Sequence, residues 1–217
     1  PLTGCPAVFI RLAGCHLACT FCDTEFETGI SNRMSVYEVV ARAVGAAAGG
    51  SGLDATTGLG RILVVLTGGE PLRQSCGPLI HALNDVGFKH TQIETAGNLW
   101  DPRLANYLTD QTCSLVCSPK TPQVHRHIGA YCRDWKYVVK AGEINDRGLP
   151  TGNTQVNGTG GPWQIPPEFM DGNTIWLSPM DEHESFKNAD NIKAAVDTCM
   201  KHGYRLSLQT HKILGMP

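Results

Sequence analysis

Short apolar runs alternate with amphipathic segments along almost the whole chain. The runs are four to six residues long and carry several β-branched side chains, which is typical of buried strands. Strands are predicted at residues 7–12, 61–66, 91–95, 115–118, 135–140, 174–177 and 205–208. Between them, hydrophobic positions spaced three or four residues apart predict helices, so strand and helix alternate along the sequence.

The clearest helix start lies at Ser35. Its hydroxyl can cap the first turn, Glu38 three positions on can cap in return, and a valine stripe follows. This helix should fade in the glycine-rich stretch of residues 45–60. Further helices are predicted at residues 79–86, near residues 103–108 and at residues 192–202.

Alternating strands and helices predict parallel strand pairing with right-handed crossovers. The sheet is then either doubly wound or a partial barrel, and in both cases binding residues gather where the strands end. Residues 142–167 are rich in Gly, Asn, Thr and Pro and show no periodicity, so they are predicted to form a long loop, either disordered or a lid.

Composition narrows the class of protein. The 217 residues, 41% of them hydrophobic, suffice for one domain, residues 1–217, and the chain opens at Pro1, which suggests that a segment preceding the first strand is missing. The net charge of -2 does not favour a nucleic-acid ligand. No signal peptide or membrane-length apolar run is present, so we expect a cytoplasmic protein that binds no membrane.

Three of the nine cysteines are closely spaced, as Cys15-x3-Cys19-x2-Cys22. In a reducing compartment, clustered cysteines indicate a metal site before a disulfide. Three thiolates suit a 4Fe-4S cluster and leave one iron open for another ligand. The alternative is a structural zinc site, which needs a fourth ligand such as Cys5 or His16; Cys5 lies at the far end of the strand and His16 directly follows a ligand.

The cysteine spacing, with Phe21 before the third cysteine, resembles the signature of the radical S-adenosylmethionine superfamily. Thr67-Gly-Gly-Glu-Pro71 is similar to the second motif of that superfamily, in which glycines let the backbone approach the bound methionine group. Each motif follows a predicted strand. Their combination is far more specific than a glycine pair alone.

The chain further resembles the 7-carboxy-7-deazaguanine synthase family, which acts in the biosynthesis of queuosine and related deazapurines. The matching stretches extend over nearly the whole chain: Pro6–Cys15, Cys22–Thr24, Thr67–Pro71, Ile93–Gly97, Cys117–Lys120, Ser178–Asp181 and Arg205–Lys212. The resemblance implies a homodimer of partial (β/α) TIM-type barrels with about six to seven parallel strands. It also implies conversion of 6-carboxy-5,6,7,8-tetrahydropterin to 7-carboxy-7-deazaguanine with loss of ammonia.

The cofactors implied by the resemblance are a 4Fe-4S cluster, S-adenosylmethionine and Mg2+, with flavodoxin or ferredoxin as electron donor. The cluster would be held by Cys15, Cys19 and Cys22, and magnesium by Thr24. S-adenosylmethionine would contact Phe21, Asp23, Gly69, Glu70, Ser118, Pro119, Lys120, Ser178, Pro179, Met180 and Asp181. The pterin would contact Arg11, Thr67 and the terminal Pro217.

Several of these side chains have a second interpretation. Arg11 lies among apolar neighbours, where a buried unpaired arginine is costly, so capture of a substrate carboxylate is favoured over a surface position. Thr24 suits magnesium and helix capping equally, and Glu94 suits a substrate contact and a satisfied core carboxylate. Lys120 and Asp181 are either binding residues at strand ends or surface charges.

Two departures from the family pattern concern binding. The Gln-Gly-Glu-Gly segment that normally precedes the first strand is absent, and Ser178 stands where some relatives carry glutamine.

Two alternative functions remain open at this point. A glycyl-radical activating enzyme shares the cysteine motif but acts on a protein. A non-catalytic zinc-binding module is the alternative from another class.

Overall fold

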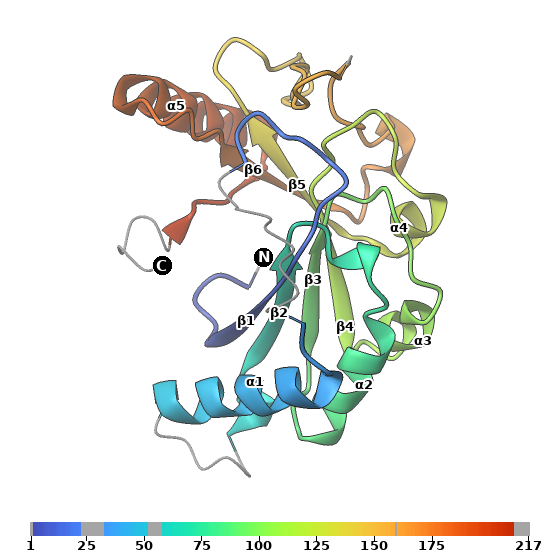
Figure 1. Cartoon of the computed structure of the whole chain (residues 1–217). Helices are drawn as coiled ribbons and strands as arrows, with labels where there is room; N and C mark the ends of the chain where they lie inside the picture. The colour runs from blue at the N-terminus through green and yellow to red at the C-terminus, as the bar shows by residue number, and fades with distance from the viewer. Residues whose placement is uncertain (1, 23–32, 52–57, 159, 211–217) are drawn as a thin grey trace.

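A computed structural model describes residues 2–22, 33–51, 58–158 and 160–210. Its centre is a sheet of seven parallel strands in which every strand pairs with the next one along the chain (Figure 1). The strands are β1 (Ala7–Leu12), β2 (Leu63–Gly68), β3 (Thr91–Thr95), β4 (Cys113–Cys117), β5 (Asp134–Val139), β6 (Thr174–Pro179) and β7 (Arg205–Leu206). All seven strands were predicted, and β1 and β3 have the predicted bounds.

The consecutive strand order excludes one of the two predicted architectures. A doubly wound sheet reverses its strand order at a switch point, whereas here the order runs from β1 to β7 without reversal. The described sheet is open, since β1 and β7 are its two edges. The fold is therefore the predicted partial barrel.

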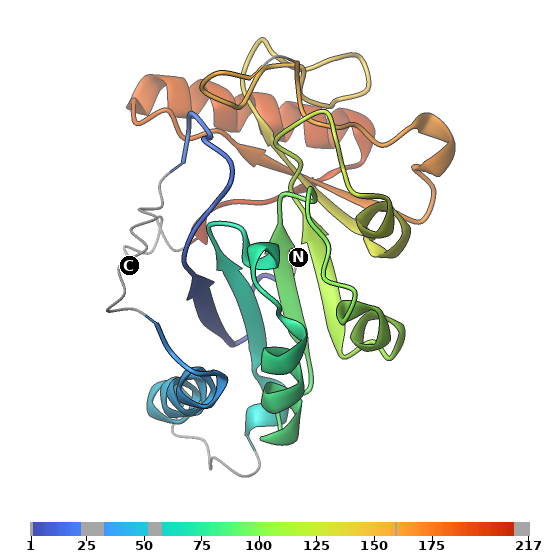
Figure 2. The same cartoon turned by 45° about the vertical axis from the view of Figure 1, so that its right-hand side comes forward.

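Five α-helices accompany the strands in the described ranges. They are α1 (Val36–Ser51), α2 (Gly77–Asp85), α3 (Leu104–Thr109), α4 (Arg126–Tyr131) and α5 (Ser185–His202); short 3-10 turns are η2 (Leu59–Arg61), η3 (Pro71–Arg73) and η4 (Pro167–Phe169). In Figure 2, α2, α3 and α4 lie on the same side of the strands. The helix α4 was not predicted; it carries one buried apolar side chain, Ile128, which forms no periodic pattern.

Both ends of α1 follow the prediction. Ser35 and Glu38 form the reciprocal cap, with the Ser35 backbone N–H donating to Glu38 Oε2 at 2.7 Å. The helix continues past Gly45 and ends at Ser51, within the predicted stretch of residues 45–60. Ala43 and Ala47 are buried on one face of this stretch, so packing outweighs the low helix propensity of its glycines.

The strand register gives the sheet two different faces. Leu66, Ile93 and Leu115 are register partners on neighbouring strands, and all three are buried in the core against the helices. On the opposite face, Arg11 pairs in register with Thr67, and positions such as Glu94 and Lys136 are polar. A parallel sheet covered on both faces has apolar side chains on both. The polar face is instead suited to bind a ligand.

Residues 142–158 and 160–166 form a packed loop, so disorder, one of the two predicted alternatives, is wrong for them, and the lid stays a prediction. Leu149 and Ile165 are fully buried, and Thr154 is 3% exposed. The Asn145 side chain organises the first turn by accepting hydrogen bonds from the backbone N–H groups of Arg147 and Leu149. The order of this loop depends on local side-chain hydrogen bonds and on burial against other parts of the protein. Hydrophobic periodicity reveals neither.

In the part of the chain that the structure describes, no helix combines the length and apolarity that crossing a membrane requires.

Candidate active site

The loops after β1 and β2 interlock at one end of the sheet. The backbone N–H of Gly69 donates to Leu12 O at 3.0 Å, and that of Glu70 donates to Gly14 O at 2.9 Å. Gly68 has a φ of +130°, and a Cβ on Gly69 would stand 2.1 Å from Gly14 O. Only glycine allows this approach, which fixes the cysteine loop against the glycine turn.

Glu70 ties the glycine turn to the next strand. The residue is 1% exposed, and its Oε1 accepts hydrogen bonds from the backbone N–H of Leu72 and the hydroxyl of Thr95. Its Oε2 accepts from the backbone N–H of Ala96 at 2.7 Å. The described contacts of Glu70 are thus with protein groups. Its predicted contact with S-adenosylmethionine stays a prediction.

Cys15, Cys19 and Cys22 all lie on the loop after β1 as free thiols. Arg73 Nη1 donates to Cys15 O at 3.2 Å and fastens the start of the loop, and the Cys22 backbone N–H donates to Cys19 O in a turn within the loop. Among the described residues, no three potential ligands converge closely enough for a single metal ion. Three soft thiol donors on one loop are nevertheless the donor set of an iron-sulfur cluster with one open iron.

Cys19 is half-buried, and the pKa of its thiol is shifted. Burial raises the pKa of its thiol, while the hydrogen bond from Gln155 and the positive charge of Lys120 oppose that rise. Gln155 Nε2 lies 3.2 Å from Cys19 Sγ. The sequence analysis did not select Gln155, because it belongs to the loop without periodicity.

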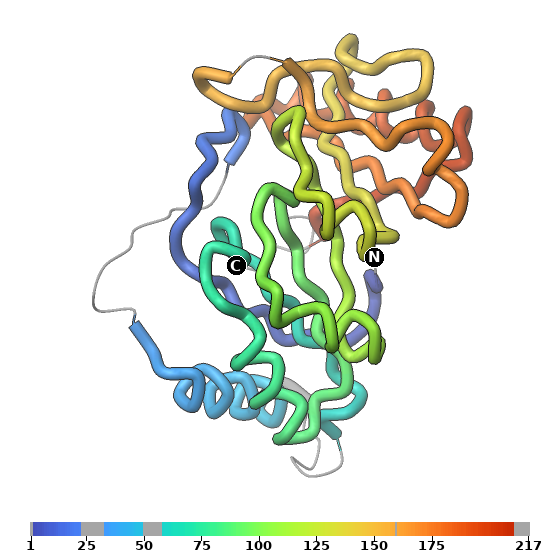
Figure 3. The backbone as a smooth tube through the Cα atoms, turned by 90° about the vertical axis from the view of Figure 1, so that its right-hand side faces the viewer, coloured from blue at the N-terminus to red at the C-terminus, as the bar shows by residue number. Residues whose placement is uncertain are grey.

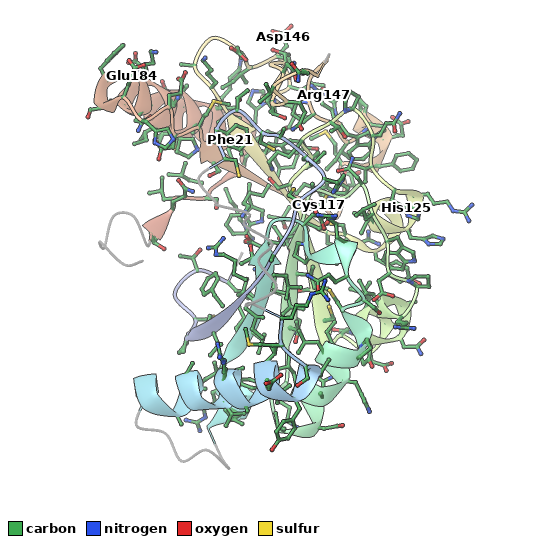
Figure 4. All side chains as sticks on the ribbon, in the orientation of Figure 1. Phe21, Cys117, His125, Asp146, Arg147 and Glu184 are labelled. Carbon is green, nitrogen blue, oxygen red and sulfur yellow. The ribbon has the colours of Figure 1, made fainter. Side chains whose placement is uncertain are left out.

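The turn after β4 brings a lysine to the cysteine loop. Lys120 Nζ donates to the carbonyl and hydroxyl oxygens of Ser118 at 2.8 and 2.5 Å and lies 5.9 Å from the centre of the Phe21 ring. Phe21, labelled in Figure 4, comes from the cysteine loop. Burial lowers the pKa of Lys120 to about 8. Lys120 is half-buried and bonded to Ser118, which argues against a free surface charge, and Pro119 beside it is buried. The predicted contacts of these residues with S-adenosylmethionine stay predictions.

The turn after β6 lies at the same end of the sheet as the turns after β1, β2 and β4. Ser178 and Pro179 close β6, and the Met180 backbone N–H donates to Val139 O at 2.9 Å. Asp181 is half-buried, and its Oδ1 accepts hydrogen bonds from Asn188 Nδ2 and the backbone N–H of His183. The carboxylate is thus held in place and does not lie free on the surface.

The polar face of the sheet carries an ion pair that joins β3 to β5. Lys136 Nζ lies 2.9 Å from Glu94 Oε1, and both side chains are largely buried. Burial alone would raise the pKa of Glu94, but the charge and hydrogen bond of Lys136 outweigh it and lower that pKa. Glu94 is therefore a satisfied carboxylate on the open face, and its predicted substrate contact stays a prediction. Lys136 was not predicted.

The Arg11 side chain is exposed, whereas the sequence analysis assumed that its apolar neighbours bury it. The predicted cost of burying an unpaired arginine therefore does not apply. It lies on the polar face, in register with Thr67 of β2. The structure thus brings two of the three predicted pterin-binding residues to neighbouring positions. Asp23, Thr24, His211 and Pro217 lie outside the described residues.

The other cysteines are separate from this site. Cys76, Cys113, Cys117, Cys132 and Cys199 are buried. Burial raises the pKa of Cys76, Cys113 and Cys132 to about 12, which keeps these thiols protonated at neutral pH. Cys5 is exposed at the opposite end of β1 from the cysteine loop.

Solved structures share this fold at low sequence identity. Native anSMEcpe with bound AdoMet superposes with a TM-score of 0.56 at 14% identity, covering 97% of this chain and 67% of that one. SuiB of Streptococcus suis, bound to the precursor peptide SuiA, gives 0.55 at 13% identity over 94% of this chain, which spans about half the length of SuiB. These solved structures show the fold of this chain, which carries a three-cysteine loop after β1.

Curated relatives identify the family. A 7-carboxy-7-deazaguanine synthase of Rhodospirillum rubrum is 38% identical, covering 99% of this chain and 86% of the relative. Synthases of Rickettsia prowazekii and Escherichia coli K12 are 31% and 30% identical, covering 98% and 99% of this chain and 81% and 92% of the relatives. No family profile matches the chain. The chain belongs to the 7-carboxy-7-deazaguanine synthase family.

Proposed function

We propose that the protein is a radical S-adenosylmethionine lyase that converts 6-carboxy-5,6,7,8-tetrahydropterin to 7-carboxy-7-deazaguanine with loss of ammonia. The observation that carries this proposal is the similarity to a curated synthase, at 38% identity over 99% of the chain. Family membership favours this reaction over that of a glycyl-radical activating enzyme and over a zinc-binding module.

The residues present fit the cofactors that the family implies. Cys15, Cys19 and Cys22 would hold the cluster, and the Gly68–Gly69 backbone, which approaches the cysteine loop within hydrogen-bond distance, would face the methionine group. When bound, the cluster and S-adenosylmethionine together supply the radical chemistry that starts the ring contraction. The protein must then position the pterin and exclude water.

The polar face of the sheet supplies groups for positioning. The Arg11 guanidinium suits a two-point contact with the pterin carboxylate, and Thr67 beside it provides a hydroxyl. The Glu94–Lys136 pair offers an acceptor and a donor for the amine and carbonyl groups of the pterin ring. Lys120, with a pKa of about 8, adds a positive charge beside the cysteine loop at neutral pH.

The remaining assignments follow the family pattern. Thr24 would bind magnesium, because a hydroxyl oxygen is an acceptable ligand for this hard cation, and the pterin would supply further oxygens. The Ser118–Lys120 and Ser178–Asp181 turns would contact S-adenosylmethionine from the ends of β4 and β6. A flavodoxin or ferredoxin would deliver electrons, and the enzyme would act as a homodimer.

The test is anaerobic reconstitution with iron and sulfide, followed by incubation with dithionite, S-adenosylmethionine, magnesium and 6-carboxytetrahydropterin. We expect 7-carboxy-7-deazaguanine by mass spectrometry from the wild type and none from Cys19→Ala. Cys132→Ala is the matched control, since this buried cysteine lies outside the loop and should leave the product detectable. A brown protein that cleaves S-adenosylmethionine and leaves the pterin unchanged would contradict the proposed substrate.

A further inference from the structure

The loop of residues 142–158 lies against the cysteine loop. In Figure 3 it crosses the tip of the blue segment that carries the cysteines. The Thr20 backbone N–H donates to Thr154 O at 3.0 Å, and the Val156 backbone N–H donates to Ala18 O at 2.9 Å. These two bonds flank an antiparallel bridge between Cys19 and Gln155. The contact is thus a short stretch of backbone pairing and holds both loops in register.

The Gln155 side chain adds two contacts inside this pairing. Its Oε1 accepts a hydrogen bond from the Ala18 backbone N–H at 3.1 Å. Its Nε2 lies 3.2 Å from Cys19 Sγ, and also 3.4 Å from Thr154 Oγ1 and 3.5 Å from Lys120 O. An amide nitrogen has two hydrogens, so it can donate to the sulfur and to one of these oxygens together.

A buried threonine holds the loop at this position. Thr154 is 3% exposed, and its hydroxyl donates to Lys120 O at 2.6 Å. The backbone beside Gln155 is therefore anchored to two other elements, the cysteine loop and the turn after β4. An anchored side chain donates a hydrogen bond with little loss of conformational entropy.

We propose that Gln155 is a positioning residue of the iron-sulfur site, whose side-chain amide donates a hydrogen bond to the Cys19 sulfur and raises the reduction potential of the cluster. This inference rests on the proposed function only in taking Cys19 as a cluster ligand. Reduction adds negative charge to the cluster and its sulfurs, and a donor to a ligand sulfur stabilises the more negative state.

The measurement is the midpoint potential of the reconstituted cluster, followed by EPR in a redox titration without pterin or S-adenosylmethionine. Gln155→Leu should have a more negative midpoint than the wild type. We expect about a tenfold lower ratio of reduced to oxidised cluster at one applied potential, or about 59 mV for a one-electron couple. Gln155→Glu keeps the acceptor for the Ala18 N–H but replaces the donor, so its midpoint should also fall.

Gln164→Leu is the matched control. Gln164 lies in the same loop, where its Nε2 donates to Pro150 O at 2.9 Å and its Oε1 accepts from Asn145 Nδ2 at 3.0 Å. The substitution removes two hydrogen bonds from the loop without touching Cys19, so the midpoint should stay at the wild-type value. The EPR signal reports loaded chains alone, so partial cluster incorporation does not obscure the comparison.

Two results would overturn the proposal. One is an unchanged midpoint in both Gln155 variants, and the other is an equal shift in Gln164→Leu, which would indicate general loosening of the loop. Either result leaves the proposed reaction intact if the wild type forms product. A wild type that forms no product, combined with a shift specific to Gln155, would reject the reaction and retain the role of Gln155.

Discussion

Glu70 Oε1 accepts a hydrogen bond of 2.7 Å from the hydroxyl of Thr95, which fastens the turn after β2 to the end of β3. The same turn is bonded through its backbone to the cysteine loop after β1. Through its carboxylate and its backbone N–H, Glu70 thus links three consecutive strand ends. The position of the cysteine loop therefore depends on a residue that is not a cluster ligand.

Replacement of Glu70 by glutamine should destabilise the fold. An amide nitrogen would face one of the donors that Glu70 now accepts from, leaving it unsatisfied in a buried site at a cost of about 1–3 kcal/mol. Urea unfolding of the apoprotein measures this loss. Glu184→Gln is the control, because Glu184 forms an exposed pair with Lys187 that contributes about 0–1 kcal/mol. Equal losses in both variants would contradict the role of Glu70.

Gly69→Ala should disrupt the junction between the two motif loops. Its added methyl group would meet Gly14 O at 2.1 Å, and backbone atoms cannot move aside without breaking the hydrogen bonds there. We expect at least a tenfold loss of cluster incorporation, measured as iron and sulfide per chain. Gly129→Ala in α4 meets no atom within 4 Å and should stabilise the protein by about 0.5–1 kcal/mol.

In the variant Lys136→Met, the free energy of unfolding should depend on whether Glu94 is protonated. In the wild type the pKa of Glu94 is lowered from its usual 4.5, so the pair stabilises the fold above that pH, and this contribution is lost as the pH falls through the lowered pKa. Without Lys136, burial raises the pKa instead. We expect a loss of about 2 kcal/mol at neutral pH, less than the ~3–5 kcal/mol of a fully buried pair.

The sign of that pH dependence is the test. The deficit of Lys136→Met should shrink as the pH falls through the raised pKa, because protonation removes the unpaired charge. The double variant Glu94→Gln with Lys136→Met carries no charge at either position and should show a deficit that is independent of pH down to about pH 5, below which the wild type itself begins to lose the contribution of the pair. Urea unfolding between about pH 4 and 7 measures both curves. A constant deficit in the single variant would show that the pair does not determine the pKa.

Arg11→Met should weaken binding of the pterin carboxylate. Hydrogen bonds to a charged group contribute about 1.5–3 kcal/mol, so KM should rise roughly 10- to 150-fold if the contact is made with the bound substrate. A tetrahydropterin without the 6-carboxyl group is the matched ligand, and its binding should be the same in both proteins. Arg42→Met on the exposed side of α1 is the control for loss of a positive charge. An unchanged KM would assign Arg11 another role.

Local sequence signals located the strands well and the helix ends less well. β1 and β3 have the predicted bounds, because both strands carry β-branched residues and each is followed within two residues by a glycine, Gly14 or Gly97. The helix α1 continues through glycines because Ala43 and Ala47 pack into the core, which is a tertiary contact. Strand β7 ends at Leu206, short of the predicted residue 208, since its described pairing is with β6 alone.

The sequence by itself determined the class of site, because cluster ligands and glycine turns lie within short stretches whose spacing sets their geometry. It did not select Lys136, whose partner Glu94 lies on another strand 42 residues away. Nor did it select Gln155, which is 136 residues from Cys19 and belongs to a loop without periodicity. Only the tertiary structure decided these contacts, because the parallel order of the strands brings distant loops together at one end of the sheet.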